Sequence, residues 1–470
     1  MEKVLLIRGG TVVTVGGSFP ADVLCREGRI AALLAPGAGR PEGEVLDASG
    51  CYVLPGGVDA HVHLQMPVGE IVSADDFMSG TIAAACGGTT TVVDFATQER
   101  GQPLEEAVAL RRAEADGKVA VDYSLHLAVT DASEETLRAL PRLVEAGYAS
   151  FKLYTVYPAL GLEDGEILCL LKVARETGAM PLVHCENRAI VEHGTRRLLA
   201  AGKREPRYHP QARPDLAEAE AVRRILALAE TADSPVCIAH LSTRRALGEV
   251  CRARTRGQRV YIETCPQYLL LTEEEYARPG FEGAKYVLTP PLRKDADREA
   301  LWTALAQGEV DLLSTDHCPW NYRGQKERGR EDFSLIPNGL PGIETRLVLL
   351  WSEGVGKGRL SPERFVALTA TNPARLFGLY PRKGAIAPGA DADLAILDPA
   401  RRVTLRAEAL HQRVDYCPYE GWEVVGYPRD VLVRGRPVVR EGRFVGEAGW
   451  GTFVPRRPGA WIAGGGRPTL

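Results

Sequence analysis

The sequence of 470 residues lacks the marks of secreted, membrane and nucleic-acid-binding proteins. Its 10 cysteines include no Cys-x-x-Cys pair and are too sparse for a disulfide framework, so we expect reduced thiols. No apolar run approaches the ~20 residues that span a bilayer. The 57 basic and 61 acidic residues give a formal charge of −4, without the basic excess typical of nucleic-acid binders. We therefore expect no membrane and no nucleic-acid partner.

The amino-terminal segment, MEKVLLIRGGTVVTVGG, lacks the apolar core and cleavage site of a signal peptide, which predicts a cytoplasmic protein. No repeat and no low-complexity tract is found, which argues against a solenoid or a disordered chain. The composition, 25% charged and 45% hydrophobic, is that of a globular protein. The length favours two domains, or one large barrel with an appendage.

The two ends of the chain share a β-rich pattern. Runs such as KVLLIRGGTVVTV near the start and DVLVRGRPVVREGRFVG near the end alternate apolar residues with Gly-containing turns. This pattern predicts antiparallel hairpins. We predict one smaller β-sandwich domain formed by residues 1–54 together with 384–470. Within it, the segment VPRRPGAWIAGGGRP is expected to be an irregular surface tail.

The middle of the chain alternates strand-like and helix-like segments. Amphipathic stretches typical of helices cover residues 133–146, 163–178 and 215–232. Eight strand-like runs are found at residues 56–63, 88–95, 121–129, 149–154, 180–185, 235–240, 259–265 and 310–316. Eight such units predict an α/β fold, a (β/α)8 TIM barrel over residues 55–383. Later, Thr371-Asn372-Pro373 predicts a helix start with Asn372 as its N-cap.

Metal-binding side chains fall at the carboxyl ends of five predicted strands. His61 and His63 end the first strand, and their i, i+2 spacing turns both rings to one face. The remaining candidates end later strands: Lys152, His184, His240 and Asp316. A single strand histidine is usually a core residue, and a strand-end aspartate usually caps a helix. Five strands ending this way predict a metal site in the barrel mouth, where barrel enzymes build their active sites.

Lys152 needs a separate explanation, because an ammonium group does not bind metal ions. Burial and nearby positive charge lower the pKa of a lysine, and the neutral amine can then add CO₂. The resulting carbamate is anionic and has two oxygens that can bridge two divalent cations. The alternative is a structural lysine paired with a carboxylate. The setting among four histidines and an aspartate favours the carbamate, so we expect Lys152 to be N6-carboxylysine.

A series of longer motifs surrounds these positions, in the order PGGVDAHVHL, ADDFMSGTIAAACGGTTTVVDFA, SFKLYTVY, PLVHCEN, IAHLST, YIETCPQYLLLT, LTPPLR, STDHCPW and NGLPGIETR. Together they closely resemble the dihydropyrimidinase/hydantoinase family of cyclic amidohydrolases over nearly the whole chain. The resemblance implies two divalent metal ions per subunit, with zinc as the expected metal, and a bridging hydroxide. His61, His63, Lys152 and Asp316 would bind one ion, and Lys152, His184 and His240 the other. Relatives of this family are usually homotetramers.

The resemblance also implies an activity: hydrolytic opening of 5,6-dihydropyrimidines and 5-substituted hydantoins to N-carbamoyl amino acids. Asp316 would move a proton from the hydroxide to the leaving nitrogen. Tyr157 would donate a hydrogen bond to the developing oxyanion. Thr289 and Asn338 would bind the –NH–CO–NH– edge of the ring, largely through backbone groups. Without the resemblance, Tyr157 is a packed aromatic residue and the other two are turn residues.

Two stretches depart from the family pattern, and both bear on the predicted substrate. Gln65 stands where relatives usually carry aspartate, and Pro158-Ala159-Leu160 replaces a frequent Lys-Gly. No arginine follows His63, which argues against a dihydroorotase. The alternatives are an allantoinase-like ureido-ring hydrolase and a non-catalytic binding protein of the same family. An apolar pocket for the ring substituent is expected from Leu64, Met66, Phe95 and Leu160.

Overall fold

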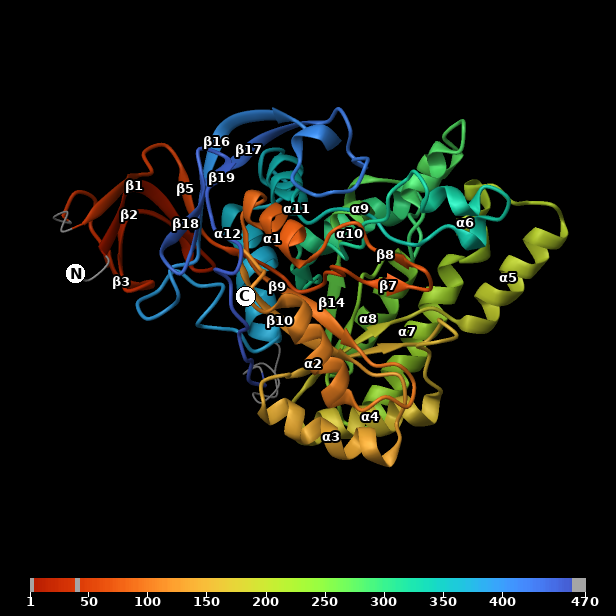
Figure 1. The fold of residues 1–470 in the computed structure, drawn as a ribbon. Helices are drawn as coiled ribbons and strands as arrows, with labels where there is room; N and C mark the ends of the chain where they lie inside the picture. Colours follow the sequence, from red (N-terminus) through yellow and green to blue (C-terminus); the bar gives the residue numbers. More distant parts are fainter. Residues whose placement is uncertain (1–3, 39–42, 459–470) are drawn as a thin grey trace.

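The computed structural model describes residues 4–38 and 43–458. Its centre is an eight-stranded parallel sheet in which the neighbour order follows the chain, as predicted (Figure 1). The strands are β6 (Gly57–Asp59), β9 (Thr89–Thr97), β10 (Asp122–Ala128), β11 (Ser150–Tyr154), β12 (Met180–His184), β13 (Val236–Ile238), β14 (Val260–Thr264) and β15 (Leu312–Leu313). Each strand lies within one of the eight predicted segments or extends it by two residues at most.

Contacts beside and beyond β6 and β15 bring the two outer strands of this sheet together. Val62 and His317 form a parallel bridge, and the Thr315 hydroxyl donates to Asp59 Oδ2 at 2.7 Å. The buried Arg346 donates to Val58 O in β6 at 3.0 Å and to Leu313 O in β15 at 2.8 Å. The predicted TIM barrel is therefore confirmed as a nearly closed barrel.

Helices surround the barrel and follow its strands (Figure 1). The main ones are α1 (Phe77–Cys86), α2 (Leu104–Ala115), α3 (Glu134–Glu145), α4 (Asp164–Thr177), α5 (Arg188–Ala200), α7 (Asp215–Thr231), α8 (Arg244–Thr255) and α10 (Asp295–Ala306). In α4, Ile167, Leu170, Leu171 and Ala174 are buried at helical spacing. The helix ends at Gly178, whose φ of 72° suits a residue without a Cβ. No helix in the described ranges is long and apolar enough to cross a membrane.

The predicted N-cap at Asn372 is wrong. Asn372 has helical backbone angles within a continuous run formed by α12 (Pro362–Val366), a π-helical turn (Ala367–Thr371) and α13 (Asn372–Leu376). Its side-chain amide donates to Asp311 O at 2.8 Å and caps no helix. The wide turn changes the hydrogen-bonding pattern, so Pro373, which has no N–H, is accommodated inside the run.

Both ends of the chain contribute to a second sheet, as predicted, which lies to one side of the barrel (Figure 1). It contains β1 (Val4–Thr14), β2 (Gly17–Arg26), β3 (Arg29–Leu34), β4 (Glu44–Asp47), β5 (Tyr52–Pro55), β16 (Leu394–Thr404), β17 (Glu423–Val433), β18 (Arg436–Arg440) and β19 (Arg443–Phe444). The two ends meet where β5 pairs antiparallel with β16. Side chains from both ends, including Ile7, Val23, Val53, Ile396 and Leu432, share one buried cluster.

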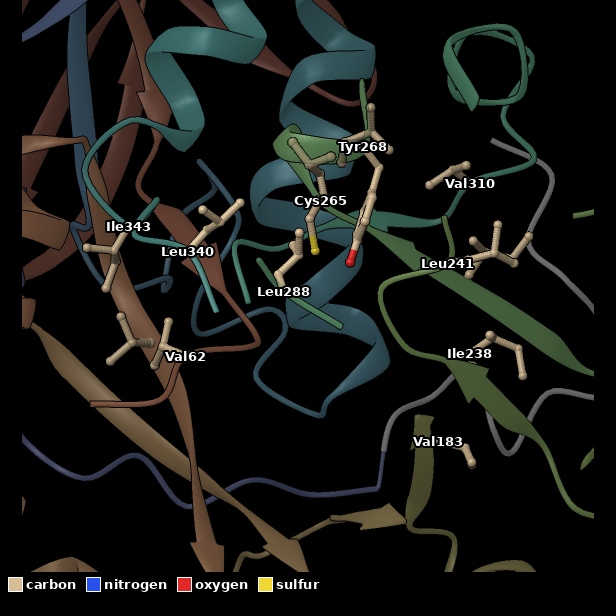
Figure 2. Packing of buried hydrophobic residues seen from close by; sticks show 14 of the residues in the cluster. Val62, Val183, Ile238, Leu241, Cys265, Tyr268, Leu288, Val310, Leu340 and Ile343 are labelled. Carbon is tan, nitrogen blue, oxygen red and sulfur yellow. The ribbon is translucent and has the colours of Figure 1, made fainter. Parts of the chain in front are cut away.

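The packing between barrel and helices explains how side chains are directed into the barrel. Val62 and Val183 belong to the large buried cluster drawn in Figure 2. Because neighbouring side chains in extended backbone point to opposite faces, burial of Val62 on this side turns His61 and His63 inward. Burial of Val183 likewise turns His184 inward.

Candidate active site

A cavity of about 1150 Å³ opens at the carboxyl ends of the barrel strands. All nine residues predicted for the site line this cavity: His61, His63, Lys152, Tyr157, His184, His240, Thr289, Asp316 and Asn338. They come from segments up to 277 residues apart in sequence (61 to 338), so folding brings residues that are remote in the sequence into one cavity.

One half of the cavity floor is built around Asp316. Its Oδ1 atom lies 3.3 Å from His61 Nε2 and 3.2 Å from His63 Nε2. Lys152 Nζ lies 3.2 Å from the same His61 nitrogen. Histidine, lysine and carboxylate atoms thus share one small volume at the end of β6, β11 and β15.

The other half of the floor is formed by His184 and His240. His184 Nδ1 lies 3.0 Å from His240 Nε2. His240 also joins the first half, because ligand atoms of His61, His240 and Asp316 all lie within 4.8 Å of one another. All six predicted ligands therefore belong to one continuous cluster.

Electrostatics in this cluster favour neutral imidazoles at His61, His184 and His240 and an ionised Asp316. Burial, aided by the Lys152 charge, holds the pKa of His61 and of His240 well below the usual range. Burial also lowers the pKa of Lys152. Burial alone would raise the pKa of Asp316, but the adjacent side chains of His61, His63 and Lys152 hold it below its usual value. Neutral imidazoles and a carboxylate are the protonation states that metal ligation requires.

Two buried glutamates fix which ring nitrogens face the cavity. Glu263 Oε2 accepts a hydrogen bond from His61 Nδ1 at 2.8 Å. The other ring nitrogen, His61 Nε2, therefore faces Asp316 in the cavity. Glu186 Oε2 accepts from His184 Nε2 at 2.8 Å and from Arg213 at 2.7 Å. Carboxylates in this position orient metal-binding histidines. The sequence analysis missed both, although a glutamate inside the apolar strand YIETC was a usable signal for Glu263.

Backbone geometry contributes at two of the predicted ligands. His240 has φ = 35° and Asp316 has φ = 51°, both in the left-handed region that non-glycine residues seldom adopt. Each lies two or three residues beyond its strand, β13 or β15, where the chain turns over the barrel mouth. Such conformations persist where surrounding structure holds them, and they cluster at functional sites.

Tyr157, Thr289 and Asn338 form a polar wall of the cavity. The Tyr157 hydroxyl is hydrogen-bonded to Thr289 Oγ1. Burial raises the pKa of Tyr157, so the phenol keeps its proton at neutral pH. The side-chain oxygen of Asn338 is buried without a hydrogen-bond partner among the described residues, and its backbone oxygen accepts from Trp320 Nε1 at 2.9 Å.

An apolar wall is also present, with one correction to the prediction. Met66, Phe95 and Leu160 line the cavity as expected. Leu64 does not, because it is completely buried and packs closely against Gly80 of α1. Leu335, which the sequence analysis missed, lines the cavity and is 61% exposed.

The donor set fits divalent metal ions. His61 Nδ1 donates to Glu263, so its Nε2 carries a lone pair that faces the Asp316 carboxylate at 3.3 Å. Two acceptors facing each other repel, and a cation between them removes the repulsion. His240 Nδ1 is buried without a hydrogen-bond partner among the described residues. Imidazole and carboxylate donors in a closed cluster suit zinc and similar ions.

Comparison with known proteins identifies the family. The sequence matches the Amidohydrolase family over residues 52–438. A D-hydantoinase from Streptomyces coelicolor is 45% identical over 461 residues, which cover 97% of this chain and 98% of that protein. The chain belongs to the dihydropyrimidinase and D-hydantoinase family of amidohydrolases. The resemblance predicted from the sequence motifs is thereby confirmed.

Similarity to other members of the dihydropyrimidinase and D-hydantoinase family supports the same assignment. A D-hydantoinase from Geobacillus stearothermophilus is 45% identical over 96% of each chain. The crystal structure of the dihydropyrimidinase from Brevibacillus agri superposes with a TM-score of 0.96 at 44% identity and covers 98% of this chain and 100% of that one. The barrel with its additional sheet is therefore the architecture of this family.

Proposed function

We propose that this amidohydrolase opens cyclic imides, converting 5,6-dihydropyrimidines and 5-substituted hydantoins to N-carbamoyl amino acids. The chain is a cyclic-amide hydrolase by its family, whose members compared above are named D-hydantoinase and dihydropyrimidinase. The observation that carries the substrate proposal is the polar wall of Tyr157, Thr289 and Asn338 standing over a floor of six ligand-type side chains. A ring with one imide edge can meet both surfaces at once.

In this proposal the floor holds two divalent ions, and we expect zinc. His61, His63, Lys152 and Asp316 would hold one ion, and Lys152, His184 and His240 the other. The ions would supply the nucleophile, because a bound water has a lower pKa and yields hydroxide near neutral pH.

Lys152 would serve as N6-carboxylysine. Its side chain is completely buried, and burial lowers its pKa, which favours the neutral amine that adds CO₂ with release of one proton. No carboxylate of the described residues forms an ion pair with Lys152, which argues against the alternative of a structural salt bridge.

Asp316 is the proposed proton carrier. Its carboxylate is ionised at neutral pH, since its pKa lies below the usual value, and it lies at the cavity floor. It would accept the proton of the attacking nucleophile and deliver it to the ring nitrogen as the C–N bond breaks.

Tyr157 would stabilise the transition state. Its phenol keeps its proton, so it can donate a hydrogen bond to the ring carbonyl oxygen as that oxygen gains negative charge. Backbone groups at Thr289 and Asn338 would bind the –NH–CO–NH– edge. The wall formed by Met66, Phe95, Leu160 and Leu335 would contact the ring substituent.

Initial rates on dihydrouracil, hydantoin, both enantiomers of phenylhydantoin and allantoin test this proposal, with metal content assayed on the same sample. We expect turnover of the first two rings at about two metal ions per chain, and preference for the D-phenyl enantiomer. Turnover of allantoin alone would favour the ureido-ring alternative. No turnover of any of these substrates at full metal content would favour the alternative of a non-catalytic binding protein. Light scattering would test the expected homotetramer, and cell fractionation the expected cytoplasmic location.

A further inference from the structure

The two loops that carry the proposed ring-binding residues are bonded to each other. Thr289 lies in the segment 287–290, and Asn338 lies in the segment 337–339. The Gly339 amide donates to Val287 O at 3.0 Å. The position of one loop therefore depends on the position of the other.

Lys326 makes a second connection between these loops. It begins a short 3₁₀ helix (Lys326–Gly329), and its side chain is completely buried. Its Nζ atom donates to Val287 O at 2.9 Å and to Pro337 O at 3.0 Å. Val287 precedes Thr289 by two residues, and Pro337 directly precedes Asn338. One side chain thus holds a carbonyl of each loop.

The chemistry of this lysine is unusual for the protein core. No carboxylate of the described residues forms an ion pair with it, and burial lowers the pKa of Lys326 to about 7. Lysine is rarely buried without an ionic partner. A neutral amine has two N–H donors, which matches the two carbonyls, and the ammonium form has donors for both as well. The two hydrogen bonds therefore persist in either protonation state.

Other side chains hold the first loop without reaching the second. His209 Nε2 donates to Leu288 O at 2.8 Å, and the Tyr268 hydroxyl donates to Pro290 O at 2.7 Å. Neither of these side chains bonds to residues 337–339. Lys326 differs from them because its partners lie on both loops.

We infer that Lys326 is a positioning residue for substrate binding, which keeps the backbone groups of Thr289 and Asn338 at the separation that the ring edge requires. This inference rests on the proposed function, since it takes these two loops as the ring-binding surfaces. It adds a role for a residue that does not line the cavity.

The test uses Lys326→Met in the full-length, metal-loaded protein. Loss of loop alignment weakens binding of the ground state and the transition state equally, so KM for dihydrouracil should rise about tenfold while kcat changes less than about threefold. Metal content should not change. Amide hydrogen exchange should become faster at residues 287–289 and at Asn338 and Gly339, because the two hydrogen bonds of Lys326 that clamp the loops together are lost, and it should stay unchanged in β10.

Arg456→Met is the matched control. Arg456 is also a buried cation, and it donates to Ser124 Oγ and to the backbone oxygens of Leu125 and Phe377, away from the cavity. This variant should be less stable yet keep the wild-type KM. Lys326→Gln, which retains N–H donors on a shorter side chain, should give a smaller rise in KM than Lys326→Met.

Three results would overturn the inference. The first is a folded, metal-loaded Lys326→Met with KM within about twofold of wild type, since no binding would then depend on the clamp. The second is unchanged exchange in both loops. The third is failure of both Lys326 variants to fold while Arg456→Met folds, which would make Lys326 a core-stability residue. A wild-type enzyme inactive on all cyclic imides would instead refute the proposed function, and the exchange measurement would still decide whether Lys326 couples the loops.

Discussion

Lys152 is the single residue on which the two-metal proposal depends most. It is the one ligand shared by both proposed ions, and its amine binds neither without CO₂. Lys152→Ala should therefore lose metal and lower kcat at least about 10³-fold, as expected when a metal-activated nucleophile is removed. Metal analysis and steady-state rates check this. Added short-chain carboxylates should restore part of the activity, because they can occupy the space of the carbamate. Normal metal content with full activity would exclude a carbamate at Lys152.

Tyr157 offers a test of transition-state stabilisation that leaves the metal ligands intact. Tyr157→Phe removes the hydroxyl and keeps the ring packed against His184, 5.0 Å between ring centroids. We expect kcat to fall roughly 10²–10³-fold, the usual loss for one oxyanion donor. Metal content should equal that of the wild type. An unchanged kcat would assign oxyanion stabilisation to another group.

Glu263 tests whether the orientation of His61 matters for metal affinity. Its carboxylate accepts from His61 Nδ1 and from the His240 amide at 3.2 Å. Glu263→Gln keeps the shape but weakens the acceptor, so metal affinity should fall about 10–100-fold. Competition with a chelator measures this. Affinity equal to wild type would show that packing alone sets the tautomer of His61.

At the scale of elements, the strands and helices of the barrel could be predicted because their hydrophobic spacing is set locally. The segments predicted for α3, α4 and α7 each extend one residue beyond the observed helices, at one end or both. The loops above the barrel could not be predicted in the same way. The left-handed conformations of His240 and Asp316 are imposed by tertiary contacts, and no local sequence pattern predicts them.

The segment 158–160 belongs to these loops and tests the origin of substrate preference. Leu160 lines the apolar wall of the cavity. Leu160→Ala should lower kcat/KM for a phenyl-substituted hydantoin about tenfold, the value of a few methylene contacts in an apolar pocket. The rate with unsubstituted dihydrouracil serves as the internal control and should stay within about twofold. Equal losses on both substrates would mean that Leu160 supports the ring site itself.

At the scale of the whole molecule, the carboxyl-terminal segment shows where sequence reasoning fails. It was expected to be an irregular surface tail, yet Val454 and Arg456 are each 1% exposed. The Val454 amide donates to Tyr123 O at 2.7 Å, and the Arg456 amide donates to Gly147 O at 2.9 Å. An irregular segment can be buried when its backbone forms hydrogen bonds with groups that are remote in the sequence. The composition of the segment itself does not indicate such partners. Residues 459–470 of the expected tail lie outside the described residues.

The same segment predicts a contribution to global stability. Arg456→Met leaves the carbonyls of Leu125 and Phe377 without their donor in a buried position. The free energy of unfolding should fall by about 3 kcal/mol, given the cost of unsatisfied buried polar groups. Urea denaturation of variant and wild type measures the difference. An unchanged midpoint would show that the segment adds no stability to the barrel.

All nine residues predicted for the candidate site line the cavity, but the contacts that hold them in place were not predicted. Histidine spacing and strand ends indicated which side chains converge, since barrel sites form at the carboxyl ends of strands. The supporting residues Glu186, Glu263 and Lys326 were missed. Glu186 and Glu263 each accept a hydrogen bond from one histidine, and Lys326 donates to backbone oxygens of two loops. Contacts of this kind produce no periodic pattern in the sequence.

The most direct test of this account is a metal titration of activity. The protein is stripped with a chelator, then reconstituted with zinc in bicarbonate buffer, and the initial rate on dihydrouracil is plotted against zinc per chain. We expect no turnover without metal and a rate that rises until about two ions are bound. Full activity in the metal-free protein, or no turnover at two ions per chain, would contradict the proposal that this site is a two-metal cyclic-imide hydrolase.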